Sequence, residues 1–307
     1  MIDFTECQEL SKGYNGSNGI KLSIKYNDKT YMLKFPTRGK QNKNIRYSSS
    51  CISEYIGSHI FQTIGIETQN TLLGEYTYDG KTKKVVACED FIEGRPDIEF
   101  QDFLSLKNRF IELENGGDCT ELSEIEHVIK NAKLIDNEKV LEHFWDMFIV
   151  DALIGNWDRH NGNWGFLRNK STSELRLAPI FDCGSCLYPQ ADPIIMKHTL
   201  TDEAELNKRL YKIPFSAIKV DGKHIDYFQF ISSGENKDCN AALERIYEKI
   251  DLNKINEVIF NTPKIPELNK DFYSYMIEKR KDHILDHSLK QIKDLSILNN
   301  FNGIKSR

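Results

Sequence analysis

The sequence predicts an α+β protein with two lobes, a small β-rich lobe over residues 1–90 and a larger helical lobe over residues 91–307. Before residue 36, apolar and polar residues alternate in two short segments, which is the period of half-buried strands. After residue 90, apolar residues recur mainly at helical spacing. A chain of 307 residues is long enough to form one large domain or two lobes with a cleft between them.

The predicted small lobe begins with a glycine-rich segment that leads into a strand over residues 20–26. A turn at Asn27 and Asp28 connects it to a second strand over residues 30–35, and Asp79-Gly80 predicts a further hairpin within residues 71–88. Glycine lets backbone N–H groups approach phosphates closely, so the segment is a candidate phosphate-binding loop, with a plain surface turn as the alternative. The candidate residues of this loop are Gly13, Gly16, Ser17 and Gly19.

The predicted large lobe contains one helix that is defined better than the others, over residues 138–154. Its apolar face is wide, which indicates a buried helix. Before it, residues 100–137 are predicted to mix helix with a polar loop. After it, two strand-like runs around a polar turn predict a hairpin that starts after Asn163 and ends before Asp182. Further helices are predicted over residues 200–210, 239–249, 252–260 and 266–289.

Two polar segments after the buried helix hold the predicted chemistry. Residues 156–163 contain Asp158 and Asn163, and residues 179–185 contain Asp182 directly after a short apolar run. Phosphoryl transfer from a nucleotide needs a carboxylate that orients or deprotonates the attacking hydroxyl, and oxygen ligands that hold Mg²⁺ against the phosphates. The order Asp-x4-Asn followed by a strand-borne Asp occurs in protein kinases. We therefore predict a kinase with Asp158 as catalytic base and Asn163 and Asp182 as metal ligands, against the alternative of an ordinary polar turn.

Lys34 lies on the second predicted strand, opposite in phase to Leu33 and Phe35. A lysine on a strand that follows a glycine-rich loop is where a kinase needs a cation for the nucleotide phosphates. Such a lysine needs a carboxylate partner, and Glu54, in an amphipathic segment, is the candidate. An ordinary acid on a helix surface is the alternative interpretation of Glu54.

Three more residues are assigned to the nucleotide site. Glu89 and Phe91 follow the predicted hairpin where the chain crosses between lobes, so they are candidates for the hinge that contacts adenine. His160 lies within the catalytic segment; because oxygen-rich Mg²⁺ sites rarely include imidazole, a hydrogen-bonding role that braces the loop is expected. Cys183 and Cys186 form a CxxC pair, but no second ligand pair accompanies it, so the metal-loop interpretation is preferred to a zinc or redox site.

Composition limits the other functions. The chain has 41 Lys and Arg against 46 Asp and Glu, a net charge of −5, which argues against nucleic-acid binding by the chain alone. No apolar run approaches the roughly 20 residues of a membrane helix. The N-terminus lacks the pattern of a signal peptide, so a cytoplasmic location is expected, with export by a route that needs no signal peptide left open.

The segments Asn156-Trp-Asp-Arg-His-Asn-Gly-Asn163 and Pro179-Ile-Phe-Asp-Cys-Gly-Ser185 resemble the Asn-x-Asp-x-His-x-x-Asn and Phe/Tyr-Asp-x-x-Ser motifs of the HipA-like serine/threonine kinases. In size the chain resembles the stand-alone CtkA-type members of that family. The resemblance implies a protein-kinase-like fold related to the phosphoinositide 3-kinases, use of ATP and Mg²⁺, and phosphorylation of Ser or Thr, including autophosphorylation.

The resemblance also assigns roles to residues, and these agree with the assignments above for the base, the metal ligands, Lys34 and the hinge. The glycine-rich loop departs from the HipA phosphate loop, and Ser17 is the candidate autophosphorylation site within it. The sequence does not identify the protein substrate or a regulatory partner such as an antitoxin. A small-molecule or lipid phosphotransferase and a nucleotide-binding pseudokinase that acts as an interaction module are the alternative functions.

Overall fold

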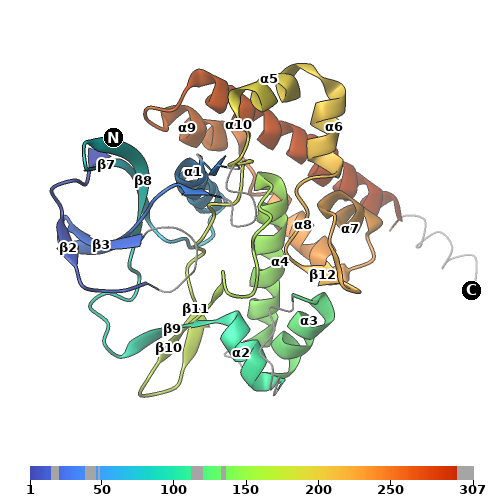
Figure 1. Ribbon diagram of the computed structural model, residues 1–307. Helices are drawn as coiled ribbons and strands as arrows, with labels where there is room; N and C mark the ends of the chain where they lie inside the picture. Colours follow the sequence, from blue (N-terminus) through green and yellow to red (C-terminus); the bar gives the residue numbers. More distant parts are fainter. Residues whose placement is uncertain (15–20, 39–45, 48, 112–119, 133–135, 296–307) are drawn as a thin grey trace, which may run out of the picture.

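The computed structural model describes residues 1–14, 21–38, 46–47, 49–111, 120–132 and 136–295. A curled β-sheet built from the N-terminal part of the chain lies on one side, and most of the helices gather on the other (Figure 1). The mixed α+β class predicted from the sequence is confirmed. The lobe boundary at residue 90 stays a prediction.

The N-terminal sheet has six strands in the order β1-β7-β8-β4-β3-β2. Neighbouring strands are antiparallel except β1 and β7, which are parallel. Both predicted turns are present, because Asn27, Asp28, Asp79 and Gly80 all have positive φ, as tight two-residue hairpins require. The strands are β1 (Ile2–Asp3), β2 (Gln8–Leu10), β3 (Lys21–Tyr26), β4 (Lys29–Lys34), β7 (Thr71–Tyr78) and β8 (Lys81–Glu89).

The first two strands were not predicted, because segments of two and three residues are too short to show an alternating pattern. A separate two-stranded ladder joins β5 (Thr37–Arg38) to β6 (Arg46–Tyr47). Helix α1 (Ser50–Thr63) follows it and packs on β7 and β8 through a small cluster that includes Cys51, Leu73 and Val86.

Helix α1 also contributes to the large helical core. Ile56, Ile60 and Phe61 are buried in the same cluster as the residues of α4 (Asn137–Ile154). One helix therefore connects the sheet to the helical part of the molecule. Because α1 reaches both, a residue on it can touch groups from the sheet and from the catalytic segments at once.

Helix α4 is the buried helix that the sequence predicts, and all its residues from Met147 to Ile154 are buried. Asp136 caps its N-terminus by accepting a hydrogen bond from Lys139 N at 3.2 Å. Gly155 ends it in the left-handed conformation, with φ of 65°, which glycine adopts without steric cost. The chain thus leaves a rigid helix directly into the catalytic segment.

A three-stranded sheet in the order β11-β10-β9 carries the catalytic segments at its ends. The predicted hairpin is confirmed as β10 (Gly165–Asn169) and β11 (Leu175–Leu177), with Asn163 before it and Asp182 after it. The third strand, β9 (Ile98–Asp102), corrects the prediction of helix and loop from residue 100. The five residues of β9 do not alternate between buried and exposed positions, so this segment lacks the period by which a strand is recognised.

Most of the other helices lie on the same side of the molecule as α4 (Figure 1). Among the described residues, no helix combines the length and the apolar composition needed to cross a membrane. Two short strands, β12 and β13, and helix α7 lie in a region for which the sequence gave no prediction. The elements are α2 (Phe103–Phe110), α3 (Leu122–Asn131), α5 (Pro193–Thr201), α6 (Glu203–Tyr211), β12 (Lys219–Val220), β13 (Lys223–His224), α7 (Tyr227–Ser233), α8 (Lys237–Tyr247), α9 (Leu252–Asn261), α10 (Glu267–Arg280) and the π-helical turn η1 (Lys281–Asp286).

Candidate active site

The catalytic segment after α4 is braced by a buried asparagine. Asn156 donates from Nδ2 to Asp151 Oδ1 at 2.9 Å, and its Oδ1 accepts a hydrogen bond from Asp158 N at 3.3 Å. Its carbonyl accepts one from the hydroxyl of Tyr227, on α7, at 2.6 Å. These bonds fix the backbone that carries the half-buried Asp158.

Arg159 joins the two catalytic segments. It lies buried and donates from Nε to Asp151 Oδ2 at 2.9 Å. Its Nη1 donates both to the carbonyl of Asn163, at 3.0 Å, and to the carbonyl of Phe181. Its Nη2 lies 3.4 Å from Cys183 Sγ. Because one nitrogen bonds both carbonyls, Asn163 and Phe181 lie close together. The end of the catalytic segment therefore adjoins Asp182, which follows Phe181 in the chain.

Asn163 closes the catalytic segment. Its Nδ2 donates to the Asp158 carbonyl at 2.8 Å and its backbone N–H donates to the His160 carbonyl at 2.9 Å. His160 Nδ1 in turn accepts a hydrogen bond from Gly162 N at 3.0 Å. The imidazole therefore braces the loop, as expected, while its assignment to nucleotide binding stays a prediction.

Asp182 is held by a lysine from the sheet. Lys34 Nζ lies 2.9 Å from Asp182 Oδ1 and 2.9 Å from Glu54 Oε2. The predicted partnership of Lys34 with Glu54 is thus present as a contact, and the alternative of a surface acid is wrong because only 2 % of the Glu54 side chain is exposed. The side chain of Asp182 is 42 % exposed, so part of it remains accessible to solvent beside its contact with Lys34.

The charges in this cluster stabilise one another. Burial alone would lower the pKa of Lys34, but the carboxylates of Asp182 and Glu54 outweigh it and raise that pKa well above its usual value. Burial would raise the pKa of Asp182, but Lys34 outweighs it and lowers that pKa. Lys34 is therefore a cation and Asp182 an anion at neutral pH.

Glu54 also positions the segment that follows Asp182, because its Oε1 accepts a hydrogen bond from Cys183 N at 3.0 Å. Helix α1 approaches this segment through Gly57. A Cβ at Gly57 would lie 2.7 Å from Cys186 Sγ and 2.9 Å from Cys183 Cβ, closer than side-chain carbons pack. Glycine at this position therefore lets α1 touch residues 182–186, the predicted metal loop.

The CxxC pair belongs to this packing. Cys183 and Cys186 are buried as free thiols, and Cys186 Sγ donates to the Ser53 carbonyl at 3.3 Å. Burial raises the pKa of Cys183 to about 12, so the thiol is protonated and unreactive at neutral pH. No cluster of three or more His, Cys, Asp or Glu side chains suited to a metal occurs in the described part of the chain.

The predicted hinge has a defined backbone geometry. Glu89 N donates to the Asn70 carbonyl at 2.8 Å, and the Glu89 carbonyl accepts a hydrogen bond from Gln69 Nε2 at 2.9 Å. The Glu89 carboxylate binds Lys29 at 2.9 Å. The Glu89 N–H is therefore already used within the protein, and adenine contact by this residue stays a prediction.

Phe91 packs beside the metal loop. Its ring lies 5.8 Å from the ring of Phe100 and 6.1 Å from that of Phe181, the residue before Asp182. The rings of Phe100 and Phe181 are 5.3 Å apart, so the three form one partly exposed aromatic cluster. An apolar cluster next to Asp182 fits the predicted contact of Phe91 with adenine.

Of the glycine-rich loop, only its first glycine lies within the described residues. Gly13 is exposed, and Gly16, Ser17 and Gly19 fall outside the described residues. The residues around Gly13 are tied to the hinge, because Lys12 Nζ and the Tyr14 hydroxyl both donate to Asp90 Oδ2, the latter at 3.1 Å.

The donor set fits a hard divalent cation. Asn163 Nδ2 is used for the Asp158 carbonyl, which leaves Oδ1 as the amide atom available to a cation. Asp182 contributes a partly exposed carboxylate that is ionised at neutral pH. Amide and carboxylate oxygens are the ligands that Mg²⁺ takes from proteins, with water and phosphate oxygens completing the shell.

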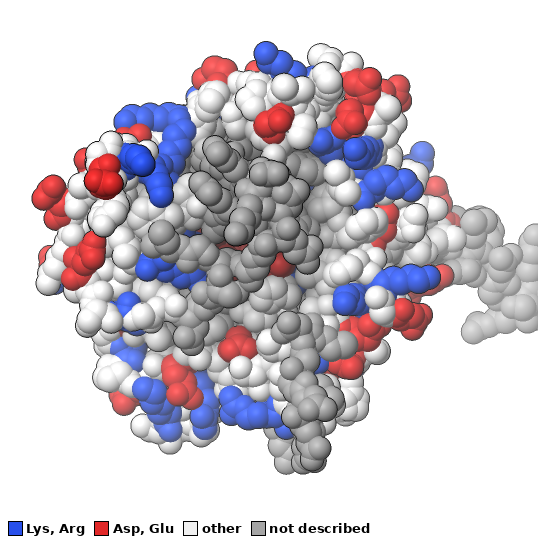
Figure 2. All heavy atoms as spheres, viewed as in Figure 1, with Lys and Arg blue, Asp and Glu red and all other residues white. Residues whose placement is uncertain are grey.

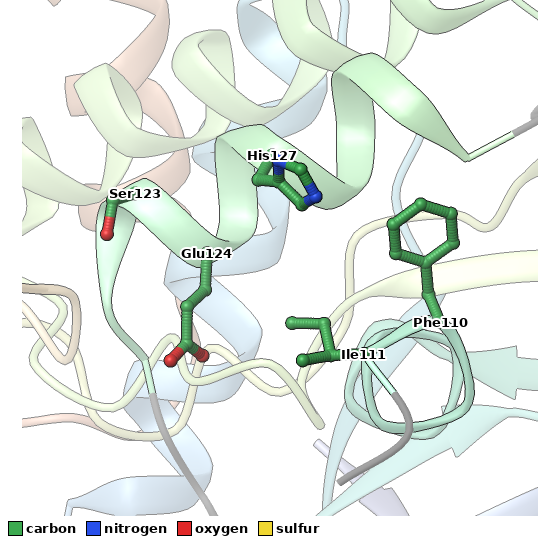
Figure 3. A pocket seen from close by; sticks show the side chains of 5 residues that line it. All are labelled: Phe110, Ile111, Ser123, Glu124 and His127. Carbon is green, nitrogen blue, oxygen red and sulfur yellow. The ribbon is translucent and has the colours of Figure 1, made fainter.

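A separate hollow lies away from the predicted active-site residues. Its volume is about 550 Å³, and it lies between α2 and α3 (Figure 3). None of its lining residues belongs to the predicted site. They are Phe110, Ile111, Ser123, Glu124 and His127. On the face of the molecule shown in Figure 2, both basic and acidic side chains are present, so charge of one sign does not dominate this face.

The sequence did not single out the residues that brace the site. Asp151, Asn156 and Arg159 are buried, and Asp151 accepts hydrogen bonds from both of the other side chains. A signal was present in the sequence, since Asp151 lies on the apolar helix 138–154 and a charged residue there needs a partner.

Comparisons with known proteins agree with this geometry. A model of the HipA-like C-terminal domain matches residues 16–253. The serine/threonine-protein kinase CtkA of Helicobacter pylori (strain J99) is 46 % identical over 298 residues, which are 96 % of this chain and 90 % of that protein. A crystal structure described as a Helicobacter pylori proinflammatory kinase CtkA superposes with a TM-score of 0.88, at 46 % identity, covering 96 % of this chain and 98 % of that one.

A more distant structure shares the fold alone. The toxin HipA of Shewanella oneidensis MR-1, solved with HipB and operator DNA, matches with a TM-score of 0.57 at 17 % identity, covering 93 % of this chain and 67 % of that one. The family match covers most of the chain and the kinase relative is similar over nearly its whole length. The chain therefore belongs to the HipA-like family of serine/threonine kinases.

Proposed function

We propose that this chain is an ATP- and Mg²⁺-dependent kinase that transfers the γ-phosphate to serine and threonine hydroxyls of proteins. The observation that carries the proposal is the position of Lys34 Nζ, 2.9 Å from both Glu54 and Asp182. In protein kinases a strand lysine paired with a helix acid, beside the acid that binds the metal, is the arrangement of the assembled nucleotide site. The kinase relative at 46 % identity supports the same activity.

Each residue has a role in this mechanism. Lys34 binds the nucleotide phosphates, Glu54 holds Lys34 in place, and Asp158 accepts the proton of the attacking hydroxyl. The hydroxyl oxygen forms a bond to the γ-phosphorus while the bond from that phosphorus to the bridging oxygen breaks. Asn163 and Asp182 would hold Mg²⁺, which when bound neutralises phosphate charge.

The test is transfer of labelled γ-phosphate from ATP to three kinds of acceptor: the protein itself, a generic protein such as casein, and a panel of small alcohols. We expect label on protein Ser and Thr in the presence of Mg²⁺ and none after chelation with EDTA. Label on small alcohols alone would favour a small-molecule phosphotransferase. Nucleotide binding without any transfer would favour a pseudokinase and contradict the proposal.

Three finer expectations belong to the same proposal. Autophosphorylation at Ser17 follows from the resemblance, and mass spectrometry of protein incubated with ATP tests it. HipA of Shewanella oneidensis was crystallised with HipB, and an antitoxin or other regulatory partner for this chain stays an open expectation. A cytoplasmic location is proposed from the sequence.

A further inference from the structure

The last residue of α10 is a buried arginine that touches the end of α4. Only 1 % of Arg280 is exposed, and its Nε donates to the carbonyl of Ala152 at 2.7 Å. Its Nη1 donates to the carbonyl of Arg209 and to the hydroxyl of Tyr188, each at 3.1 Å. A Cβ added to Gly155 would lie 3.5 Å from Arg280 Nε, so the guanidinium packs against the residue at which α4 ends.

The charge of this guanidinium is balanced by the end of a helix. In the described part of the chain, the oxygens that accept hydrogen bonds from Arg280 are all uncharged. Burial of a cation is costly unless negative charge lies beside it. The last turn of an α-helix supplies partial negative charge, because its carbonyls lack partners within the helix. Ala152 lies in that turn of α4, so Arg280 caps the helix that the catalytic segment follows.

The same guanidinium lies over the ring of Tyr227, with Cζ 5.9 Å from the ring centroid. Tyr227 is 1 % exposed, and its ring also packs 5.1 Å from that of Phe148 on α4. Its hydroxyl donates to the Asn156 carbonyl at 2.6 Å, and Asn156 Oδ1 accepts a hydrogen bond from Asp158 N at 3.3 Å. A continuous set of contacts thus runs from Arg280 through Tyr227 and Asn156 to the predicted base.

We propose that Arg280 and Tyr227 are positioning residues for phosphate transfer. Together they fix the backbone from the end of α4 to Asn156, and so the direction in which Asp158 faces the attacking hydroxyl. This inference rests on the proposed function and deepens it by two residues that lie outside the sequence motifs. Arg280 also lies beyond residues 16–253, which the family model matches. The π-helical turn η1, which follows it directly, agrees with this role, because such turns are frequent at functional sites.

The experiment separates positioning of the base from stability of the fold. It measures single-turnover phosphate transfer, ATP affinity and thermal unfolding of the full chain for wild type, Tyr227→Phe and Arg280→Met. Tyr227→Phe keeps the ring and removes only the hydroxyl that holds Asn156. The control is Tyr76→Phe, because Tyr76 is also a buried tyrosine whose hydroxyl donates one hydrogen bond, to Glu9 at 2.8 Å, but it lies on β7.

We expect Tyr227→Phe to slow transfer about tenfold, because the freed carbonyl of Asn156 lets the catalytic segment shift, while ATP affinity stays within about threefold of wild type. Arg280→Met should slow transfer at least as much. The decisive measurement repeats Tyr227→Phe in the Asp158→Asn background. There it should change the rate less than about twofold, because residues that act as a unit are not additive. Tyr76→Phe should match its parent in both backgrounds.

Each contrary outcome has its own meaning. If wild-type protein transfers phosphate and Tyr227→Phe does so as fast as Tyr76→Phe, the positioning role is wrong and the proposed function stands. If Tyr227→Phe slows transfer equally in both backgrounds, the residue supports the fold alone and the inference is overturned. A folded Arg280→Met protein with the wild-type rate also overturns it, and if that variant does not fold, the two Tyr227 measurements decide. Wild-type protein that transfers no phosphate would overturn the proposed function, and this inference with it.

Discussion

Arg159 Nε lies 2.9 Å from Asp151 Oδ2, and both side chains are almost completely buried. Burial raises the pKa of Asp151, so its carboxylate needs the guanidinium beside it. The same guanidinium bonds the carbonyls of Asn163 and Phe181. One ion pair thus connects α4, the catalytic segment and the metal loop, and the positions of Asp158 and Asp182 depend on it.

Replacement of Arg159 by Met should destabilise the protein by about 3–5 kcal/mol, because it leaves the Asp151 carboxylate buried without a cation. Urea unfolding of wild type and variant measures the difference. The control is Arg168→Met, which removes a more exposed pair with Glu99 at 3.0 Å and should cost less than about 1 kcal/mol. If both variants lost the same free energy of unfolding, the buried pair of Arg159 with Asp151 would contribute no more to stability than the exposed pair.

Replacement of Glu54 by Gln should reduce kcat/KM for ATP roughly 10- to 100-fold. The amide keeps the size of the side chain but removes the charge that holds Lys34, and a charged hydrogen bond contributes about 1.5–3 kcal/mol. Steady-state phosphate transfer measures the effect, with Glu99→Gln as the control in an exposed pair. An unchanged kcat/KM in the Glu54 variant would remove Glu54 from the nucleotide site.

Replacement of Gly57 by Ala should destabilise the protein by about 1–3 kcal/mol, the usual cost of overpacking a core. The added methyl group would meet Cys186 Sγ at 2.7 Å, so α1 must move away from the metal loop. We also expect slower phosphate transfer, because Glu54 lies on the same helix. Gln62→Ala, at an exposed position of α1, is the control. If the Gly57 variant were as stable and active as that control, the segment with Cys183 and Cys186 would accommodate the added methyl group without loss of stability, which would contradict this prediction.

The stability of the protein should fall in mild acid partly because of His143. Burial and the nearby Arg159 lower the pKa of His143 to about 4, below the value of 6.5 in the unfolded chain. As the pH falls from about 6.5 to 4, the unfolded chain therefore takes up a proton that the folded protein does not, and stability is lost in this window.

The measurement for this prediction is the free energy of unfolding at pH 7 and pH 4 for wild type and for His143→Gln. The loss between the two pH values should be smaller in the variant by about 1–3 kcal/mol. His198→Gln, at an exposed histidine, should lose as much as wild type. Identical pH dependence in all three proteins would contradict a neutral His143 in the folded state.

Much of the fold could be predicted because its elements show strong local patterns. The hairpins with Asn27-Asp28 and Asp79-Gly80 turns and the buried helix 138–154 are all present. Strand β9 and the first two strands were missed because their stability comes from pairing with distant strands, which a short segment does not reveal.

The site could be predicted only in part for a similar reason. The spacing of Asp158, Asn163 and Asp182 predicts a phosphoryl-transfer site, and the contact of Lys34 with Glu54 was expected from what phosphate binding requires. Arg159 could not be assigned, because its role depends on three segments that meet only in the folded protein.

The most direct test of the central claim is single-turnover phosphate transfer by Asp158→Asn beside wild type, with ATP affinity and thermal unfolding measured on the same samples. If Asp158 is the base in a site assembled from these loops, the rate should fall roughly 100-fold or more, while ATP affinity stays within about threefold and the variant remains folded. Transfer at the wild-type rate by a folded Asp158→Asn protein would contradict the account.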